Sequence, residues 1–107
     1  MHGFQVTFFM EENRRHGDKP MHRWLREVAK SLDIKGMTTT VGVEGVGRDG
    51  RLHSAHFIEL SDQPVEVTFA VTEAQCAALL ELLERDKADI FYVKTAVEFG
   101  VVGGLAG

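Results

Sequence analysis

Hydrophobic and polar residues alternate in four stretches of the chain, and each alternation predicts a β-strand with one buried face. The four stretches are Phe4–Met10, Met37–Val43, Val65–Val71 and Phe91–Phe99. A shorter run, Ser54–Leu60, is ambiguous, and we interpret it as an optional edge strand that would pair with the second stretch. The pattern therefore predicts four main strands and one optional strand.

Two other segments place apolar residues three or four positions apart, which is typical of an amphipathic helix. The first segment follows Pro20, a residue that suits the first turn of a helix. The second follows Thr72, which has capping-box spacing to Gln75. Both segments are predicted to be helices with one buried side. Their apolar stripes are Met21, Trp24, Leu25, Val28 and Leu32 in the first helix and Cys76, Leu79, Leu80 and Leu83 in the second.

The predicted elements follow one another as strand, helix, strand, a connection, and again strand, helix, strand. Two right-handed crossover units in this order predict an α+β fold, a ferredoxin-like βαβ-βαβ sandwich whose antiparallel sheet carries both helices on one face. A chain of 107 residues with 44% hydrophobic residues is long enough for one core and too short for two. We expect one domain over residues 1–100 and a flexible glycine-rich tail over residues 101–107.

The sheet face opposite the helices is predicted to carry mainly small or polar side chains. Such a face could be solvated, or it could line a wet interface between subunits, because a small domain often oligomerises to bury more area. Leu82, outside the main stripe of the second helix, is a further candidate contact. The residues expected on this face are Gln5, Thr7, Phe9, Thr38, Thr40, Thr68, Ala70, Tyr92, Lys94 and Ala96.

Charge and cysteine content exclude several classes of function. The formal net charge is −4 and the basic residues are scattered, which argues against nucleic-acid binding. The first residues lack the basic region and long apolar region of a signal peptide, and no segment is long enough to insert into a membrane. The single cysteine, Cys76, excludes an internal disulfide and is expected in the core. These features favour a cytoplasmic protein.

A cluster of glycines matches the spacing of a dinucleotide-binding fingerprint. The cluster is Gly45-Val46-Gly47-Arg48-Asp49-Gly50. A true fingerprint must open a helix whose N-terminus holds the pyrophosphate, whereas here Gly50 is followed by Arg51-Leu52-His53-Ser54 and no helical stripe. The dinucleotide interpretation is therefore rejected. Two alternatives remain: backbone N–H groups that hold phosphate oxygens with help from Arg48, or an ordinary turn.

A resemblance to a known family rests on an ordered set of motifs. Gly36-Met37-Thr38, the following strand and the glycine cluster resemble the second strand and the start of the T-loop of PII signalling proteins. The whole chain is similar to a family of short PII-like proteins. The motifs that carry this similarity are Met1-x-Gly3, Glu12, Gly17-x-Lys19-Pro20, Gly42-x-Glu44-Gly45-x-Gly47, His53 and Ser61-Asp62-x-Pro64-Val65.

The resemblance implies a homotrimer with ligands in the clefts between subunits, at the base of a T-loop-like segment over residues 44–53. It implies a signalling role in which an adenine nucleotide, AMP, ADP or ATP, acts as effector without being a required cofactor, and in which the loop contacts an unidentified protein partner. Gly45 and Gly47 would offer backbone contacts and Arg48 a phosphate contact. The full set of expected ligand-binding residues is Gly42, Glu44, Gly45, Gly47, Arg48, His53, Lys19 and Lys87.

The chain departs from PII proteins at two places. The loop at residues 84–89 lacks glycine, and the end of the last strand lacks the basic segment that closes the PII cleft. These departures favour a ligand with fewer phosphates than ATP. For Lys19 and Lys87 the alternative is a solvated side chain.

Two further hypotheses come from other classes of protein. A CutA-like, metal-responsive trimer would use His53 and His56, with His16 and His22 as further candidates. However, a three-residue step along a strand places two side chains on opposite faces, and no acid or cysteine completes a known ligand spacing. A small ferredoxin-like enzyme is the other alternative, but the sequence shows no nucleophile with an adjacent base. We therefore expect no catalytic residues and no metal site.

Overall fold

The computed structural model describes residues 1–42, 44–46, 52–54 and 63–103, and of residues 44–46 and 52–54 it describes the backbone alone. A four-stranded antiparallel sheet is formed by β1 (His2–Glu11), β4 (Met37–Val41), β7 (Pro64–Thr72) and β8 (Phe91–Glu98). The strand order is β4-β7-β1-β8. This order and the two crossovers confirm the predicted ferredoxin-like fold.

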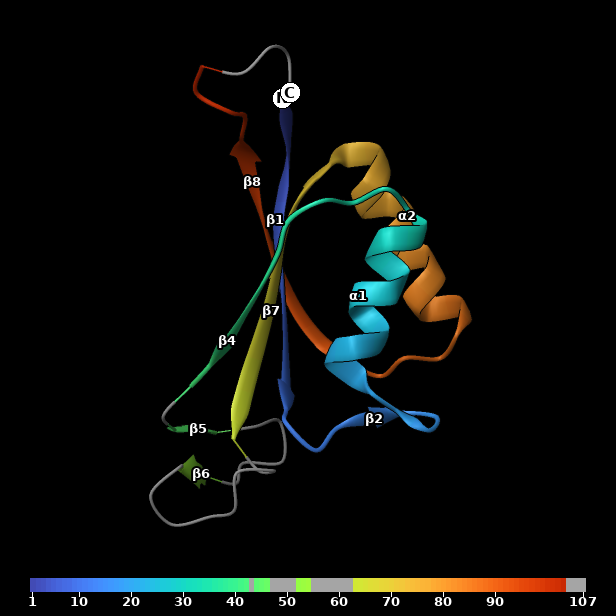
Figure 1. Ribbon diagram of the computed structural model, residues 1–107, viewed down its shortest axis with the longest axis vertical. Coiled ribbons are helices and arrows are strands. Elements are labelled where there is room, and N and C mark those ends of the chain that lie inside the picture. Colours follow the sequence, from blue (N-terminus) through green and yellow to red (C-terminus); the bar gives the residue numbers. More distant parts are fainter. Residues whose placement is uncertain (43, 47–51, 55–62, 104–107) are drawn as a thin grey trace.

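Two helices cover one face of this sheet (Figure 1). Helix α1 spans Met21–Ser31 and α2 spans Glu73–Arg85. The predicted capping box begins α2, since the backbone N–H of Gln75 donates to Thr72 Oγ1 at 3.2 Å and the Gln75 side chain accepts from the Thr72 N–H at 2.9 Å. Neither helix in the described part of the chain is long and apolar enough to cross a bilayer.

The core lies between the helices and the sheet. Its largest fully buried side chains include Phe8 and Phe69, whose rings meet edge to face with centroids 6.0 Å apart. Leu82 is partly buried and packs against this core, so the structure accounts for it within the chain. The remaining large core residues come from both helices, from β1 and β7 and from the turn after α1: Val6, Met10, Met21, Leu25, Val28, Ile34, Val65, Val67, Val71, Cys76, Leu79 and Leu83.

Two short hairpins were not predicted from the sequence. Strands β2 (Arg15–His16) and β3 (Lys19–Pro20) pair just before α1, and Gly17 turns the chain between them with φ +64°. Strands β5 (Glu44–Val46) and β6 (Leu52–Ser54) form a second antiparallel pair beyond the end of β4 (Figure 1). The optional edge strand predicted for residues 54–60 lies almost entirely outside the described residues.

The face assignment for the last strand was wrong. Lys94, Tyr92 and Ala96 were expected on the open face, but they stand opposite Val6, Phe8 and Phe4 of β1. Since directly opposite residues of paired strands point to the same side, all three belong to the helix-bearing side of the sheet. The Lys94 ammonium lies 4.6 Å from the centroid of the Phe4 ring.

The open face is consequently more apolar than expected at β8. Residues of β8 that stand opposite Gln5, Thr7 and Phe9 are Thr95, Val93 and Phe91. Phe91 and Val93 are exposed in the single chain, at 48% and 46%. The register supports the open-face positions that were predicted for β4 and β7. Thr38 stands directly opposite Thr68, and Thr40 stands opposite Glu66.

Candidate functional site

Gly42 marks the point where the chain leaves the sheet toward segment 44–53. It follows β4, and its N–H donates to the Pro64 carbonyl oxygen at 2.7 Å. A Cβ atom at Gly42 would lie 3.1 Å from Pro64 Cγ, so a larger residue would press on the start of β7. The close approach of these two segments explains the glycine by packing rather than by a left-handed backbone.

The β5–β6 hairpin brings together expected ligand residues that are eight or more positions apart in the sequence. In its register Gly45 stands opposite His53, and Glu44 stands opposite Ser54. Three predicted site positions therefore share one hairpin, next to Gly42. Gly47, Arg48 and His56 lie outside the described residues.

Lys19 lies in β3, which pairs with β2 on the helical side of the molecule (Figure 1), and it has an ion-pair partner. Its Nζ is 2.7 Å from Glu27 Oε2, and both side chains are 48% exposed. An ion pair at this exposure contributes little to stability, about 0–1 kcal/mol, so Lys19 could exchange Glu27 for another anion at low cost.

Lys87 lies just after the C-terminal end of α2 and has a backbone conformation that favours glycine. Its φ is +57°, its N–H donates to the Glu84 carbonyl at 3.0 Å, and the Ala88 N–H donates to the Leu83 carbonyl at 2.9 Å. These two bonds form a Schellman motif, in which glycine is the usual residue at the left-handed position. A lysine there is less stable than glycine by about 1 kcal/mol.

Lys87→Gly is therefore expected to raise the free energy of unfolding by about 1 kcal/mol in denaturant titration. The matched control is Glu81→Gly at an exposed position inside α2, which should lower stability by about 1 kcal/mol. The same variant tests the ligand assignment of Lys87, because loss of a phosphate contact would weaken nucleotide binding while the fold becomes more stable. A less stable Lys87→Gly protein would contradict the account of this helix end.

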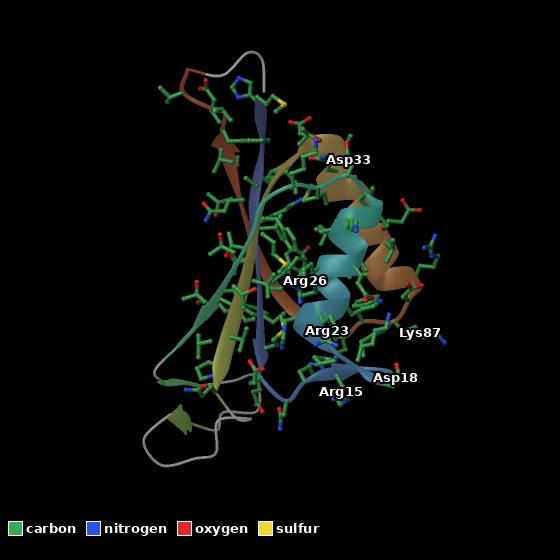
Figure 2. All side chains as sticks on the ribbon, in the orientation of Figure 1. Arg15, Asp18, Arg23, Arg26, Asp33 and Lys87 are labelled. Atoms are coloured by element: carbon green, nitrogen blue, oxygen red, sulfur yellow. The ribbon has the colours of Figure 1, made fainter. Side chains whose placement is uncertain are left out.

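Among the described members of the expected ligand set, Lys87 is separated from the β5–β6 hairpin. Figure 2 shows Lys87 on the helical side of the molecule, whereas β5 and β6 lie beyond the end of β4 on the other side. Lys87 and the described part of the hairpin therefore do not share one cleft within a single chain.

A group of aromatic and titratable residues surrounds the β2–β3 hairpin. The His16 ring stacks on Trp24 with centroids 3.7 Å apart, and His22 Nε2 lies 3.3 Å from Glu12 Oε1. The Arg14 guanidinium donates to the Asp89 carbonyl oxygen and so ties this region to the segment after α2. Glu12 is therefore in a contact within the chain, and Trp24 packs as expected.

Cys76 is buried in the core, as predicted. Burial raises the pKa of its thiol above the ordinary value of 9.0, and the nearby Lys94 charge only partly offsets this effect. The thiol is neutral at pH 7 and is a poor nucleophile. In the described part of the chain no group of three or more His, Cys, Asp or Glu side chains could hold a metal ion.

The fold and the strand order are those of a ferredoxin-like domain, and solved PII-like proteins share this fold. CPII from Thiomonas intermedia K12, a nitrogen regulatory PII-like protein bound to ADP, AMP and bicarbonate, superposes with a TM-score of 0.63 at 18% identity, over 91% of this chain and 89% of that one. A protein from Thermus thermophilus, described as a PII-like signalling protein, gives 0.66 at 19% identity, over 91% and 88%. The apo form of CPII gives 0.55 at 15% identity, over 91% and 92%.

The family itself is identified from the sequence. The family model described as DUF190, Uncharacterized ACR, matches residues 3–99. The chain belongs to the DUF190 family, and the resemblance to short PII-like proteins is confirmed.

Proposed function

We propose that the protein is a cytoplasmic, trimeric PII-like regulator that binds an adenine nucleotide in clefts between subunits. Segment 44–53 would present a surface to a protein partner, and nucleotide binding would change that surface. The fold supports this proposal, since CPII shares it and has been crystallised with ADP and AMP. An effector that is bound and released unchanged requires no catalytic group.

The observation that carries the proposal is the β5–β6 hairpin at the end of β4. It gathers Glu44, Gly45 and His53 beside Gly42. Glycines at a strand end let a ligand approach the backbone closely, and phosphate oxygens accept hydrogen bonds from exposed N–H groups. Arg48, which follows β5 in the chain, would add a charge-assisted contact.

The open sheet face supports the trimeric state. Phe9 and Phe91 pair across β1 and β8 with ring centroids 5.6 Å apart, and Val93 is 46% exposed next to them. Thr7 and Thr68 hydrogen-bond to each other through their hydroxyl groups at 3.0 Å, which uses polar groups within the chain. The part of the face formed by Phe91, Val93 and the paired threonines can be buried against other subunits at little cost in desolvation.

Calorimetric titration of the purified full chain with AMP, ADP and ATP tests the function. Binding with a dissociation constant of about 1 mM or tighter corresponds to about −4 kcal/mol and gives measurable heat. AMP or ADP should bind more tightly than ATP, because the loop at residues 84–89 has no glycine that would let further phosphates approach the backbone, and the end of β8 lacks a basic segment that would hold them. No heat and no thermal shift with any of the three nucleotides would contradict the proposal.

Arg48→Ala is expected to weaken binding of the confirmed nucleotide by roughly ten- to a hundredfold, because a hydrogen bond to a charged group contributes about 1.5–3 kcal/mol. Arg23→Ala is the matched control, since Arg23 is an exposed arginine on α1. The Arg23→Ala variant should bind the nucleotide with the same affinity as the unmodified chain. Equal affinity of the Arg48→Ala variant would remove the role assigned to Arg48.

A further inference from the structure

Helix α1 carries more positive charge than its own carboxylates can neutralise. Arg23, Arg26 and Lys30 are exposed along the helix, and Glu27 is its only acidic residue. Glu27 is paired with Lys19 at 2.7 Å. Among the described residues, no carboxylate forms an ion pair with Arg26 or Lys30, and like charges four positions apart on a helix repel each other.

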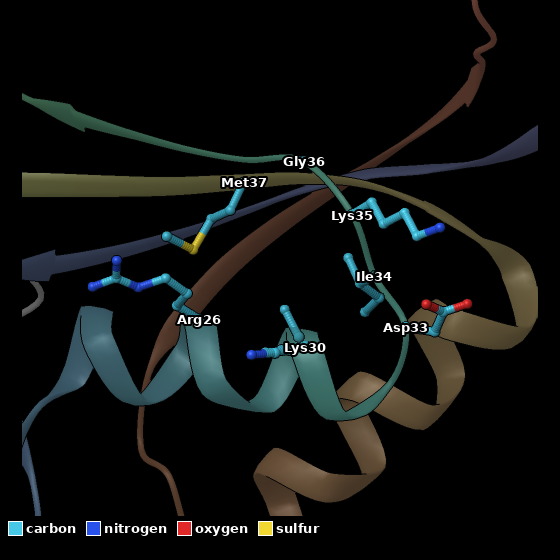
Figure 3. Close-up of a pocket in the computed structure, with 8 residues that line it drawn as sticks. Arg26, Lys30, Asp33, Ile34, Lys35, Gly36 and Met37 are labelled. Atoms are coloured by element: carbon cyan, nitrogen blue, oxygen red, sulfur yellow. The ribbon is translucent and has the colours of Figure 1, made fainter.

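Arg26 and Lys30 border a hollow between α1 and the start of β4. Its volume is roughly 480 Å³, a size typical of sites for small molecules. Figure 3 shows Arg26 and Lys30 on α1 and the Met37 side chain extending from the start of β4 toward Arg26, and all three residues line the hollow. Asp33 and Lys35 lie toward its other end.

The turn after α1 shapes this hollow. Asp33 has φ +56°, its N–H donates to the Lys30 carbonyl at 3.1 Å, and the Ile34 N–H donates to the Ala29 carbonyl at 2.9 Å. These bonds form a second Schellman motif, and they fix the direction in which the chain leaves the helix. Gly36, with φ +81°, then turns the chain into β4.

The lining combines positive charge with an apolar floor. Three cations, Arg26, Lys30 and Lys35, stand against one carboxylate, Asp33. Buried Ala29 and Ile34 and half-buried Met37 supply the apolar surface. A ligand that suits both features has at least two negative charges and a small apolar part.

We propose that this hollow binds a small organic anion, with a phosphate or carboxylate group between Arg26 and Lys30. The anion would relieve the repulsion between these two cations, and Arg26 would supply paired N–H donors. The site differs from the proposed nucleotide cleft, since it uses none of the residues assigned to segment 44–53. The protein would then have a second site for a small-molecule ligand.

Titration of the full chain with phenyl phosphate and with citrate tests the proposal and distinguishes phosphate from carboxylate ligands. The double variant Arg26→Gln/Lys30→Gln should bind the preferred probe at least about tenfold more weakly. Arg23→Gln is the control, because Arg23 is exposed on the same helix but does not line the hollow. Its affinity should be unchanged. Thermal unfolding of each variant would verify that it is folded.

Asp33→Asn gives an independent test with the opposite sign. Asparagine tolerates the left-handed conformation, and the change removes the only carboxylate among the described residues that line the hollow. Binding of the same probe should become about threefold tighter. Unchanged or weaker binding would count against the proposal.

Three results would overturn the site. The first is no heat with either probe at concentrations up to about 10 mM. The second is an equal loss of affinity in Arg23→Gln and in the double variant, which would indicate nonspecific attraction to α1. The third is loss of probe binding in Arg48→Ala but not in the double variant, which would assign the probe to the nucleotide cleft. Failure of nucleotide binding alone would leave the hollow intact, so the two proposals are separable.

Discussion

Replacing Val93 with aspartate is expected to convert the proposed trimer into monomers. Val93 lies on the open face of the sheet, opposite Thr7, and is 46% exposed in the single chain. A carboxylate buried there in an interface would lose its hydration without gaining a cation, at a cost of several kcal/mol for each subunit. Sedimentation velocity or light scattering would measure the change in mass.

The control for this change is Ala74→Glu, which adds the same charge at an exposed position in the first turn of α2. A negative charge at a helix N-terminus is favourable, so this variant should keep both its fold and its mass. An unchanged mass in the Val93→Asp variant would show that the open face is not the contact between subunits. A wild-type chain that is monomeric at all concentrations would contradict the trimer itself.

Gly3→Ala is expected to produce the largest loss of stability among these single substitutions. A Cβ atom at Gly3 would lie 1.9 Å from the Val71 carbonyl oxygen and 2.9 Å from the Thr72 Cα. Both neighbours are backbone, so β1 and β7 would have to separate at this point. We expect the free energy of unfolding to fall by about 3 kcal/mol or more, and the melting temperature by roughly 10 °C or more.

Gly100→Ala provides the matched control for Gly3→Ala. A Cβ atom at Gly100 would have no heavy atom within 4 Å, and the residue is not among those with positive φ. This variant should unfold at the same temperature as the wild type, or slightly higher because alanine restricts the unfolded chain. Equal stability of the two variants would show that β1 and β7 can separate at Gly3 without a loss in the free energy of unfolding.

The assignment of faces on β8 shows where the hydrophobic pattern is insufficient. In the segment Phe91–Glu98 both alternating sets contain large apolar residues, with Phe91 and Val93 in one set and Tyr92 in the other. The pattern predicts a strand, but it does not say which set faces the helices. The pairing with β1 decides this, because Lys94 stands opposite the core residue Val6.

The β2–β3 hairpin was missed for a related reason. Each of its strands has two residues, which is too short for any alternation to be visible. Its position is held by contacts with distant residues, such as the stack of His16 on Trp24 and the bond from Arg14 to the Asp89 carbonyl. Gly17 and Pro20 indicate only that the chain turns there and that a helix follows.

The sequence by itself determined the number, type and order of the main elements, because hydrophobic periods of two and of about 3.6 residues distinguish strands from helices within short windows. It also determined the family, since the DUF190 model matches residues 3–99. Tertiary structure alone decided which side of β8 faces the helices, why Gly3 has no side chain, and that Gly45 stands opposite His53. It also placed Arg26 and Lys30 over a hollow beside Met37. These features depend on register and on contacts between segments far apart in the chain, and no local pattern encodes them.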